Sequence, residues 1–266
     1  MKIANFTPED IHPFLALAKD EGWISTRREL AFLLERSPEG CLVCHEDTKP
    51  VGFVTAVQYG NSGWIGNLLV GADARGRGIG TTLFKQAMQV LQRRSVTTVW
   101  LTASTYGRPI YERSGFRICD RIRRWEGLCG EVTDSIKKNS LEAGWVEIDY
   151  LGWGDERSAL LKHAAAGGSV TGTENGFLVQ QRIGRRRQLG PFGAIESKTA
   201  ELLLEPVEKL GGATMLDVPA ANRAASKILT SRGFTVSSEV DLMYAGQPPA
   251  YHPEHIFGLA SMGSMG

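Results

Sequence analysis

Two spacings of hydrophobic residues alternate along the first 130 positions. After residue 80 they recur every three or four positions, which predicts one amphipathic helix carrying Leu83, Phe84, Ala87, Met88 and Leu91. Short apolar runs at 2–5, 41–44, 51–58 and 64–70 instead predict strands, because they are only four to eight residues long and end at turn-forming residues. Further strands are expected at 96–102 and 116–125.

Two helices are expected between the strands at 2–5 and 41–44. Thr7 and Pro8 are typical of a helix N-cap and first helical residue, and that helix continues to about Lys19. Ser25 is the expected N-cap of the second helix, which places Arg28 where a capping box would have an acidic residue. The resulting order of strands and helices predicts a mixed α+β fold.

A glycine-rich stretch, VGADARGRGIGT at 70–81, joins the strand at 64–70 to the amphipathic helix. Glycine lets the backbone adopt positive φ and approach a ligand closely. The first turn of a helix has unpaired N–H groups and a dipole that favours anions. This order of strand, glycine loop and helix therefore predicts a phosphate-binding site.

The spacing excludes two common kinds of phosphate loop. No Lys-Ser or Lys-Thr pair follows the glycines, as a P-loop requires. Gly76 and Gly78 fit the start of a dinucleotide fingerprint, but Thr81 stands where its last glycine belongs.

An internal repeat organises the second half of the chain. Gly52-Phe53-Val54, Gly60 and Ile65-Gly66 each have a counterpart 124 positions later, at Gly176-Phe177-Leu178, Gly184 and Leu189-Gly190. Gly115-Phe116 recurs 118 positions later as Gly233-Phe234, preceded by Asn222-x-x-Ala225. A duplicated fold is therefore predicted, with a first copy at 1–130, a linker at 131–141, a second copy at 142–246 and a tail at 247–266.

The second copy has lost the glycine loop. The same offset replaces residues 75–80 by Thr199-Ala200-Glu201-Leu202-Leu203-Leu204, which contains no glycine and carries a carboxylate that would repel phosphate. Tyr111, five residues before Phe116, corresponds to Leu229, five residues before Phe234.

The loop and the element order in residues 1–128 resemble the GNAT N-acetyltransferases, whose R/Q-x-x-G-x-G/A motif is filled here by Arg75, Gly78 and Gly80. The chain as a whole resembles a tandem GNAT protein with a degenerate second domain. The resemblance implies two domains, each with a mixed, mostly antiparallel sheet flanked by helices. It also implies an N-acetyltransferase that moves an acetyl group from acetyl-CoA to a primary amine by direct attack in a ternary complex.

The resemblance assigns roles to particular residues. The cofactor-binding residues would be Leu68, Leu69, Val70, Arg75, Gly76, Arg77, Gly78, Ile79, Gly80 and Thr81. Backbone amides of the loop would hold the pyrophosphate, and the strand before it would bind the pantetheine like an added strand. Tyr111 matches the tyrosine that protonates the leaving thiolate, a role that suits a phenol protonated at neutral pH.

The general base is not evident from the sequence. The strand before the loop has no carboxylate, which leaves Glu21, Asp20 or a water chain. Trp23 and Tyr59 are expected either to line the acceptor pocket or to belong to the core.

Composition restricts the remaining possibilities. The net charge is +1, and no apolar stretch is long enough to span a bilayer, so neither nucleic acid nor membrane is an expected partner. The N-terminus lacks a signal peptide, and Cys41 and Cys44 are expected to be buried, reduced thiols, as in a cytoplasmic protein without a metal. The acceptor is expected to be a small-molecule amine, and the oligomeric state is left open.

Two other functions compete with acetyl transfer. A non-catalytic acetyl-CoA-binding sensor would keep the loop and lack a base. Nucleic-acid binding would use Arg185-Arg186-Arg187 and the arginines at 121, 123 and 124, although the triplet falls on a predicted turn and is expected to be solvated.

Overall fold

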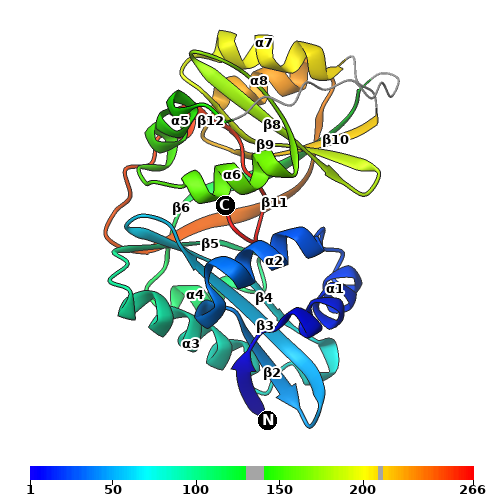
Figure 1. The fold of residues 1–266 in the computed structure, drawn as a ribbon, viewed down its shortest axis with the longest axis vertical. Helices are drawn as coiled ribbons and strands as arrows, with labels where there is room; N and C mark the ends of the chain where they lie inside the picture. The colour runs from blue at the N-terminus through cyan, green and yellow to red at the C-terminus, as the bar shows by residue number, and fades with distance from the viewer. Residues whose placement is uncertain (130–140, 209–211) are drawn as a thin grey trace. The chain divides into compact units, whose positions relative to one another are not determined.

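The computed structural model describes residues 1–129, 141–208 and 212–266 (Figure 1). Two compact units are present, one formed by Met1–Leu101 with Gly263–Met265 and the other by Thr102–Met262 with Gly266. The expected linker at 131–141 lies, apart from Leu141, outside the described residues. The units do not follow the two sequence copies, because residues 102–129 of the first copy belong to the second unit.

The first unit contains a five-stranded sheet in the order β1-β2-β3-β4-β5. Its strands are β1 (Lys2–Asn5), β2 (Leu42–Glu46), β3 (Lys49–Gln58), β4 (Ser62–Val70) and β5 (Thr98–Ala103), the last of which crosses into the second unit. Only β4 and β5 pair in parallel. The helices are η1 (Pro8–Asp10), α1 (Ile11–Asp20), α2 (Arg27–Arg36), η2 (Pro38–Gly40), η3 (Ala72–Ala74) and α3 (Ile79–Arg93).

Helices α1 and α3 cover opposite faces of this sheet. A Cβ at Gly52 of β3 would meet Ile79 and Leu83 of α3. The next residue, Phe53, meets the ring of Phe14 in α1 edge-on, with 5.3 Å between ring centroids. Successive residues of a strand point to opposite faces, so the two helices enclose the sheet from both sides.

The start of α2 differs from the expectation by one residue. Thr26, rather than Ser25, is the N-cap, and its side chain accepts a hydrogen bond of 3.1 Å from the Glu29 N–H. The third helical residue is therefore Glu29, and Arg28 lies one position earlier. The expected strands and the glycine-loop helix are confirmed, with strand bounds that differ from the expected ones by at most four residues.

The second unit contains a sheet in the order β11-β6-β10-β9-β8-β7, with β12 paired to β9. Its strands are β6 (Arg117–Cys129), β7 (Gly168–Thr173), β8 (Gly176–Ile183), β9 (Arg186–Ala194), β10 (Gly212–Pro219), β11 (Thr235–Gly246) and β12 (Ile256–Gly258). Its helices are α4 (Arg108–Glu112), α5 (Ala143–Trp153), α6 (Ser158–Ala166), α7 (Ser197–Glu208), α8 (Arg223–Ser231) and η4 (Pro253–His255). The structure thus has the mixed, mostly antiparallel sheets flanked by helices that the sequence predicts.

The repeat offset is visible in the strands that precede the two loops. Strand β4 runs from Ser62 to Val70 and β9 from Arg186 to Ala194, so both bounds are 124 positions apart. The neighbouring parallel strand also pairs at equivalent positions, Ser62 to Trp64 in one copy and Arg187 with Gln188 in the other. In both copies, the strand before the loop therefore separates from its parallel neighbour at the equivalent residue, Trp64 in β4 and Gln188 in β9.

Strand β6 belongs to the first copy by sequence but pairs with strands of the second. It is antiparallel to β10 along eight residue pairs and antiparallel to β11 on its other edge. Arg124 of β6 and the fully buried Asp217 of β10 form a two-pronged ion pair, at 2.7 and 2.8 Å. The last strand of the first copy thus completes the sheet of the second.

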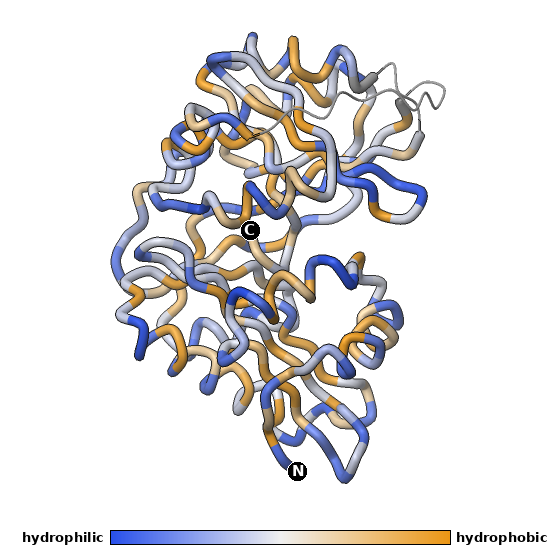
Figure 2. The backbone as a smooth tube through the Cα atoms, viewed as in Figure 1, coloured by the Kyte–Doolittle hydropathy of each residue, from blue (hydrophilic) through white to orange (hydrophobic). Residues whose placement is uncertain are grey.

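Figure 2 shows that the turn between β8 and β9 is hydrophilic, whereas the strands on either side carry apolar segments. Arg185 at this turn is exposed, and Arg186 pairs with Glu126 at 3.0 Å. Arg121 and Arg123 share one strand face and both contact Glu239. Most of the arginines that nucleic acid would require are therefore engaged by carboxylates.

Two further expectations can be checked directly. Cys41 and Cys44 are buried free thiols, as expected. Within the described residues, no helix is both long and apolar enough to cross a bilayer.

Candidate functional site

The glycine loop adopts a conformation that only glycine takes up readily. Gly76 and Gly78 have φ values of 75° and 77°, in the left-handed region. A Cβ at either position would have no heavy atom within 4 Å, so open space lies beside both. Gly76 and Gly78 therefore adopt the positive φ that a glycine loop of this kind permits, with open space beside them.

Helix α3 begins directly after this loop, with Gly78 as its N-cap. The first intrahelical acceptor is the Gly78 carbonyl oxygen, which receives the Thr82 N–H at 3.0 Å. The N–H groups of Ile79, Gly80 and Thr81 precede this bond, and helix geometry leaves them without a partner inside the helix. They form the positive end of the helix dipole, where a phosphate group is stabilised.

Both loop arginines are held by carboxylates of the same unit. Arg75 donates through Nε to the Val70 carbonyl oxygen at 3.0 Å and pairs with Glu21. Arg77 pairs with Glu46, which raises the pKa of Arg77 and lowers the pKa of Glu46. The Arg75 contacts tie the end of β4 and the end of α1 to the loop.

Strand β4 is irregular just before the loop. Asn67 has a φ of 55°, and the pairing with β3 shifts between Thr55–Gly66 and Phe53–Leu69, which marks a β-bulge. The buried Asn67 side chain donates to the Thr55 hydroxyl at 3.1 Å. Parallel pairing with β5 ends at Trp64, so residues 65–70 lie beyond that ladder, as the cofactor assignment of Leu68 to Val70 requires.

Tyr111 lies on α4 in the second unit and is 7% exposed. Burial raises the pKa of its phenol to about 12. A Cβ at Gly107 would lie 3.2 Å from the Tyr111 ring, so the small residue leaves space for it. The phenol is therefore protonated throughout the neutral range, as an acid must be.

The two aromatic residues that the sequence suggests for the acceptor pocket, Trp23 and Tyr59, differ in their exposure to solvent. Trp23 is 41% exposed, whereas Tyr59 is buried and donates through its hydroxyl to the Met265 carbonyl oxygen. Sequence reasoning missed a third residue, Glu29, whose carboxyl is buried in the first unit. Placing the N-cap at Thr26 would have exposed a Thr-x-x-Glu pattern, but nothing local indicates that this carboxyl is buried.

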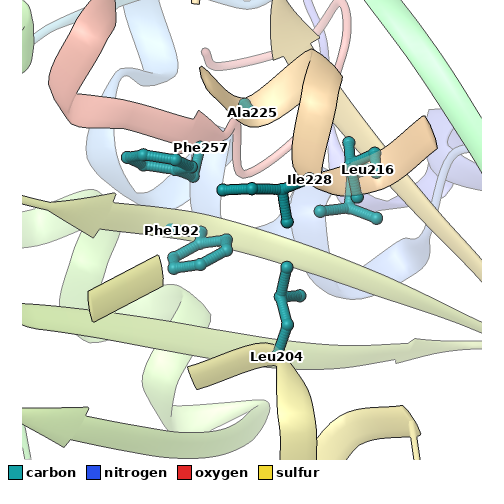
Figure 3. A pocket seen from close by; sticks show the side chains of 7 residues that line it. Phe192, Leu204, Leu216, Ala225, Ile228 and Phe257 are labelled. Carbon is teal, nitrogen blue, oxygen red and sulfur yellow. The ribbon is translucent and has the colours of Figure 1, made fainter. Parts of the chain in front are cut away.

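In the second copy, the position of the glycine loop is occupied by a helix. Only two residues separate the end of β9 from Ser197, where α7 begins, whereas eight separate β4 from α3. Leu204, the counterpart of Gly80, packs into an apolar cluster with Phe192 and Leu229, the counterparts of Leu68 and Tyr111. Figure 3 shows the side chains of the seven residues that line this space, six of them labelled, and the space is too narrow for a water molecule.

Strand β12 fills the gap where β9 and β10 part. It pairs with Phe192 and Gly193 of β9, and the following Leu259 N–H donates to the Asp217 carbonyl oxygen of β10 at 2.8 Å. The part of the tail around Phe257 and Leu259 is thus packed on the second copy, and both side chains are buried. A peptide strand of the chain itself occupies the place that corresponds to the predicted pantetheine strand of the first copy.

These features define a class of protein with two related α+β domains, one of which keeps an open glycine loop at a helix N-terminus, after a strand that separates from its parallel neighbour. A family model described as "Acetyltransferase (GNAT) family" matches residues 6–116, and one described as "Acetyltransferase (GNAT) domain" matches residues 145–258. Together the two matches cover most of the chain. The chain belongs to the GNAT acetyltransferases and carries two such domains in tandem.

Individual relatives agree with this assignment. An uncharacterized N-acetyltransferase of Methanocaldococcus jannaschii is 29% identical over 149 residues, which are 46% of this chain and 63% of the relative. A candidate acetyltransferase from Pyrococcus horikoshii superposes with a TM-score of 0.87 at 24% identity, over 99% of this chain and 95% of its own. A GCN5-related N-acetyltransferase from Sphaerobacter thermophilus gives a TM-score of 0.64 at 14% identity, over 97% and 98%. These two structures share the fold.

Proposed function

We propose that this chain transfers an acetyl group from acetyl-CoA to a primary amine, with the co-substrate held by the first copy. The observation that carries the proposal is the pair of positive-φ glycines, Gly76 and Gly78, which face open space at the N-terminus of α3. A pyrophosphate fits there because unpaired N–H groups and the helix dipole both favour an anion.

The parted strand supports the same assignment. Leu69 and Val70 pair with β3 on one edge, and residues 68–70 lie beyond the ladder to β5 on the other. Backbone groups on that free edge can hold the pantetheine as an added strand, and one amide can polarise the thioester carbonyl. The amine would then attack directly, and Tyr111 would give a proton to the departing thiolate, a role that rests on the family resemblance.

A calorimetric titration with acetyl-CoA tests the co-substrate site. We expect binding by the native chain and its loss in Gly78→Glu, because the new carboxylate would stand beside the phosphate. Gly184→Glu is the matched control, since Gly184 also has a positive φ, of 60°, and nothing within 4 Å, but lies in the β8–β9 turn. If both variants bind like the native chain, the loop is not the site.

A non-catalytic acetyl-CoA sensor is the second candidate function. It would bind acetyl-CoA in the same titration but release no thiol with any amine. Thiol release in the presence of a primary amine, absent without it, would exclude the sensor.

A further inference from the structure

Glu29 is a buried carboxylate without a cationic partner among the ion pairs of the described residues. It is 6% exposed and lies in the first turn of α2. The group in hydrogen-bond contact with the carboxylate is Ser264, near the other end of the chain. Because burying an unpaired charge lowers the stability of the fold, proteins seldom keep such a group unless it has a function.

Ser264 brings this carboxylate to strand β4. A Cβ at Gly66 would lie 2.5 Å from the Ser264 carbonyl oxygen and 2.6 Å from that of Gly263, so only glycine permits this approach. Gly66 comes directly before the bulge at Asn67 and two residues after the last pair with β5. Ser264 therefore links the Glu29 carboxylate to the part of β4 just beyond its ladder with β5.

Gly66 lies two residues before Leu68, the first of the residues assigned to the pantetheine. The pyrophosphate loop follows Val70, so the thioester end of an extended co-substrate would lie toward Leu68 and Gly66. A carboxylate connected to Gly66 through Ser264 would then be on the acceptor side of the thioester. The segment Gly263–Met265 occupies that side, and Tyr59 holds it through the Met265 carbonyl oxygen.

We infer that Glu29 binds the ammonium group of the acceptor and removes its proton, and that the Ser264 hydroxyl occupies the place of that ammonium in the present structure. This role rests on the proposed acetyl transfer. The acceptor class it selects is a primary amine that is cationic in solution, because a buried carboxylate favours a positive partner.

The step balances in two proton transfers. Glu29 takes one proton from R–NH3⁺ and becomes a neutral carboxylic acid, leaving a lone pair on the amine. That nitrogen bonds to the thioester carbon, the carbon–sulfur bond breaks, and the sulfur leaves as a thiolate. The second nitrogen proton reaches the thiolate by way of Tyr111, whose phenol gives its own proton to the sulfur and takes the nitrogen proton in its place, and the proton on Glu29 returns to water.

Burial raises the pKa of the Glu29 carboxyl to about 7, and the hydrogen bond from Ser264 lowers it by a smaller amount. A base of this strength is suited to accept a proton near neutral pH. Since the Ser264 hydrogen bond lowers the pKa of Glu29, its removal should raise that pKa further.

The test compares the native chain with Glu29→Gln and with Glu35→Gln, an exposed carboxylate on the same helix. Each protein is titrated with acetyl-CoA by calorimetry and then assayed for thiol release with ethanolamine, L-lysine and the peptide Ala-Gly-Ser. We expect all three to bind acetyl-CoA equally. Turnover should fall in Glu29→Gln by about 10²-fold or more, as for loss of a general base, and be retained in Glu35→Gln.

The outcomes separate the two proposals. Failure of the native chain to bind acetyl-CoA overturns the proposed function and this role with it. Binding without acetylation of any of the three amines overturns the acceptor class. Undiminished turnover in Glu29→Gln overturns the role of Glu29 alone.

Ser264→Ala provides a readout that a purely structural role would not affect. The acid limb of the kcat/KM profile should move to higher pH in this variant and vanish in Glu29→Gln. An acid limb at the same pH in all proteins assigns the proton to another group and overturns the inference.

Discussion

The Tyr59 hydroxyl donates a hydrogen bond of 2.8 Å to the carbonyl oxygen of Met265, 206 positions further along the chain. Both residues are buried. Together with the close approach of Ser264 to Gly66, this bond fastens the segment Gly263–Met265 to the first unit. The segment is therefore part of the fold of that unit and lies beside its candidate site.

Tyr59→Phe should loosen this segment, because the buried Met265 carbonyl oxygen loses its donor. We expect faster amide hydrogen exchange at 261–266 and a free energy of unfolding lower by about 1 kcal/mol. Tyr106→Phe, at a 96% exposed tyrosine, should change neither. Exchange in Tyr59→Phe that matches the control would show that other contacts hold the segment.

Glu29→Gln should stabilise the fold at neutral and basic pH. The folded-state pKa of Glu29, about 7, is raised above its ordinary value of 4.5, so below pH 4.5 the group is protonated in both states. Between these values the unfolded chain ionises first, and stability falls as pH rises. Above pH 7, the variant should exceed the native chain by on the order of 3 kcal/mol in urea unfolding, and the two should converge near pH 4.

Lower activity together with greater stability in Glu29→Gln would mark a residue kept for function at a cost to the fold. A native chain whose stability is independent of pH between 4.5 and 7 would contradict the assigned ionisation.

Asp217→Asn should strongly destabilise the second unit. The substitution leaves the mostly buried Arg124 guanidinium without its charge partner, which costs about 3 kcal/mol or more. Glu239→Gln also removes a carboxylate facing β6 arginines, but the partners there are exposed, so its effect should stay below about 1 kcal/mol. Urea unfolding of both variants makes the comparison, and equal losses would refute the distinction.

Tyr111→Phe should lower turnover by about 10²-fold while leaving acetyl-CoA affinity unchanged. Because the pKa of Tyr111 is about 12, the native phenol remains an acid well above neutral pH, and kcat should not decline through its ionisation below about pH 11. Tyr150→Phe, at an exposed tyrosine of α5, is the control. Full turnover in Tyr111→Phe would assign the proton to another donor.

Short-range patterns of apolar residues and glycines predicted the strands and the glycine loop. Strands β4 and β9 have bounds separated by the repeat offset of 124, and Gly76 and Gly78 of the loop have positive φ. Apolar runs and glycines determine such features within a few residues, which is why the strands and the conformation of the glycine loop could be predicted from the sequence.

The buried carboxylate could not be found in this way. Assigning the N-cap to Ser25 placed Arg28 at the third helical position and hid the Thr26–Glu29 capping pattern, an error of one residue. Even the right cap would have suggested a solvated helix start. Glu29 is buried through contacts that include Ser264, and no periodicity connects residues so far apart.

The pairing of strand β6 with strands of the second copy also could not be predicted from the sequence. Its hydrophobic pattern predicts a strand but does not state which neighbour it pairs with, since β10 and the first copy's own strands offer similar edges. The buried pair of Arg124 and Asp217 identifies the partner only once both strands are placed.

The position of β6 makes the two copies structurally dependent on each other. A gene for the second copy alone would encode a sheet without the strand that pairs with β10 along eight positions, leaving an open, aggregation-prone edge. A gene for the first copy alone would encode a last strand whose described sheet partners lie in the second. The second copy therefore cannot be removed without exposing both edges of β6, even though its own glycine loop is gone.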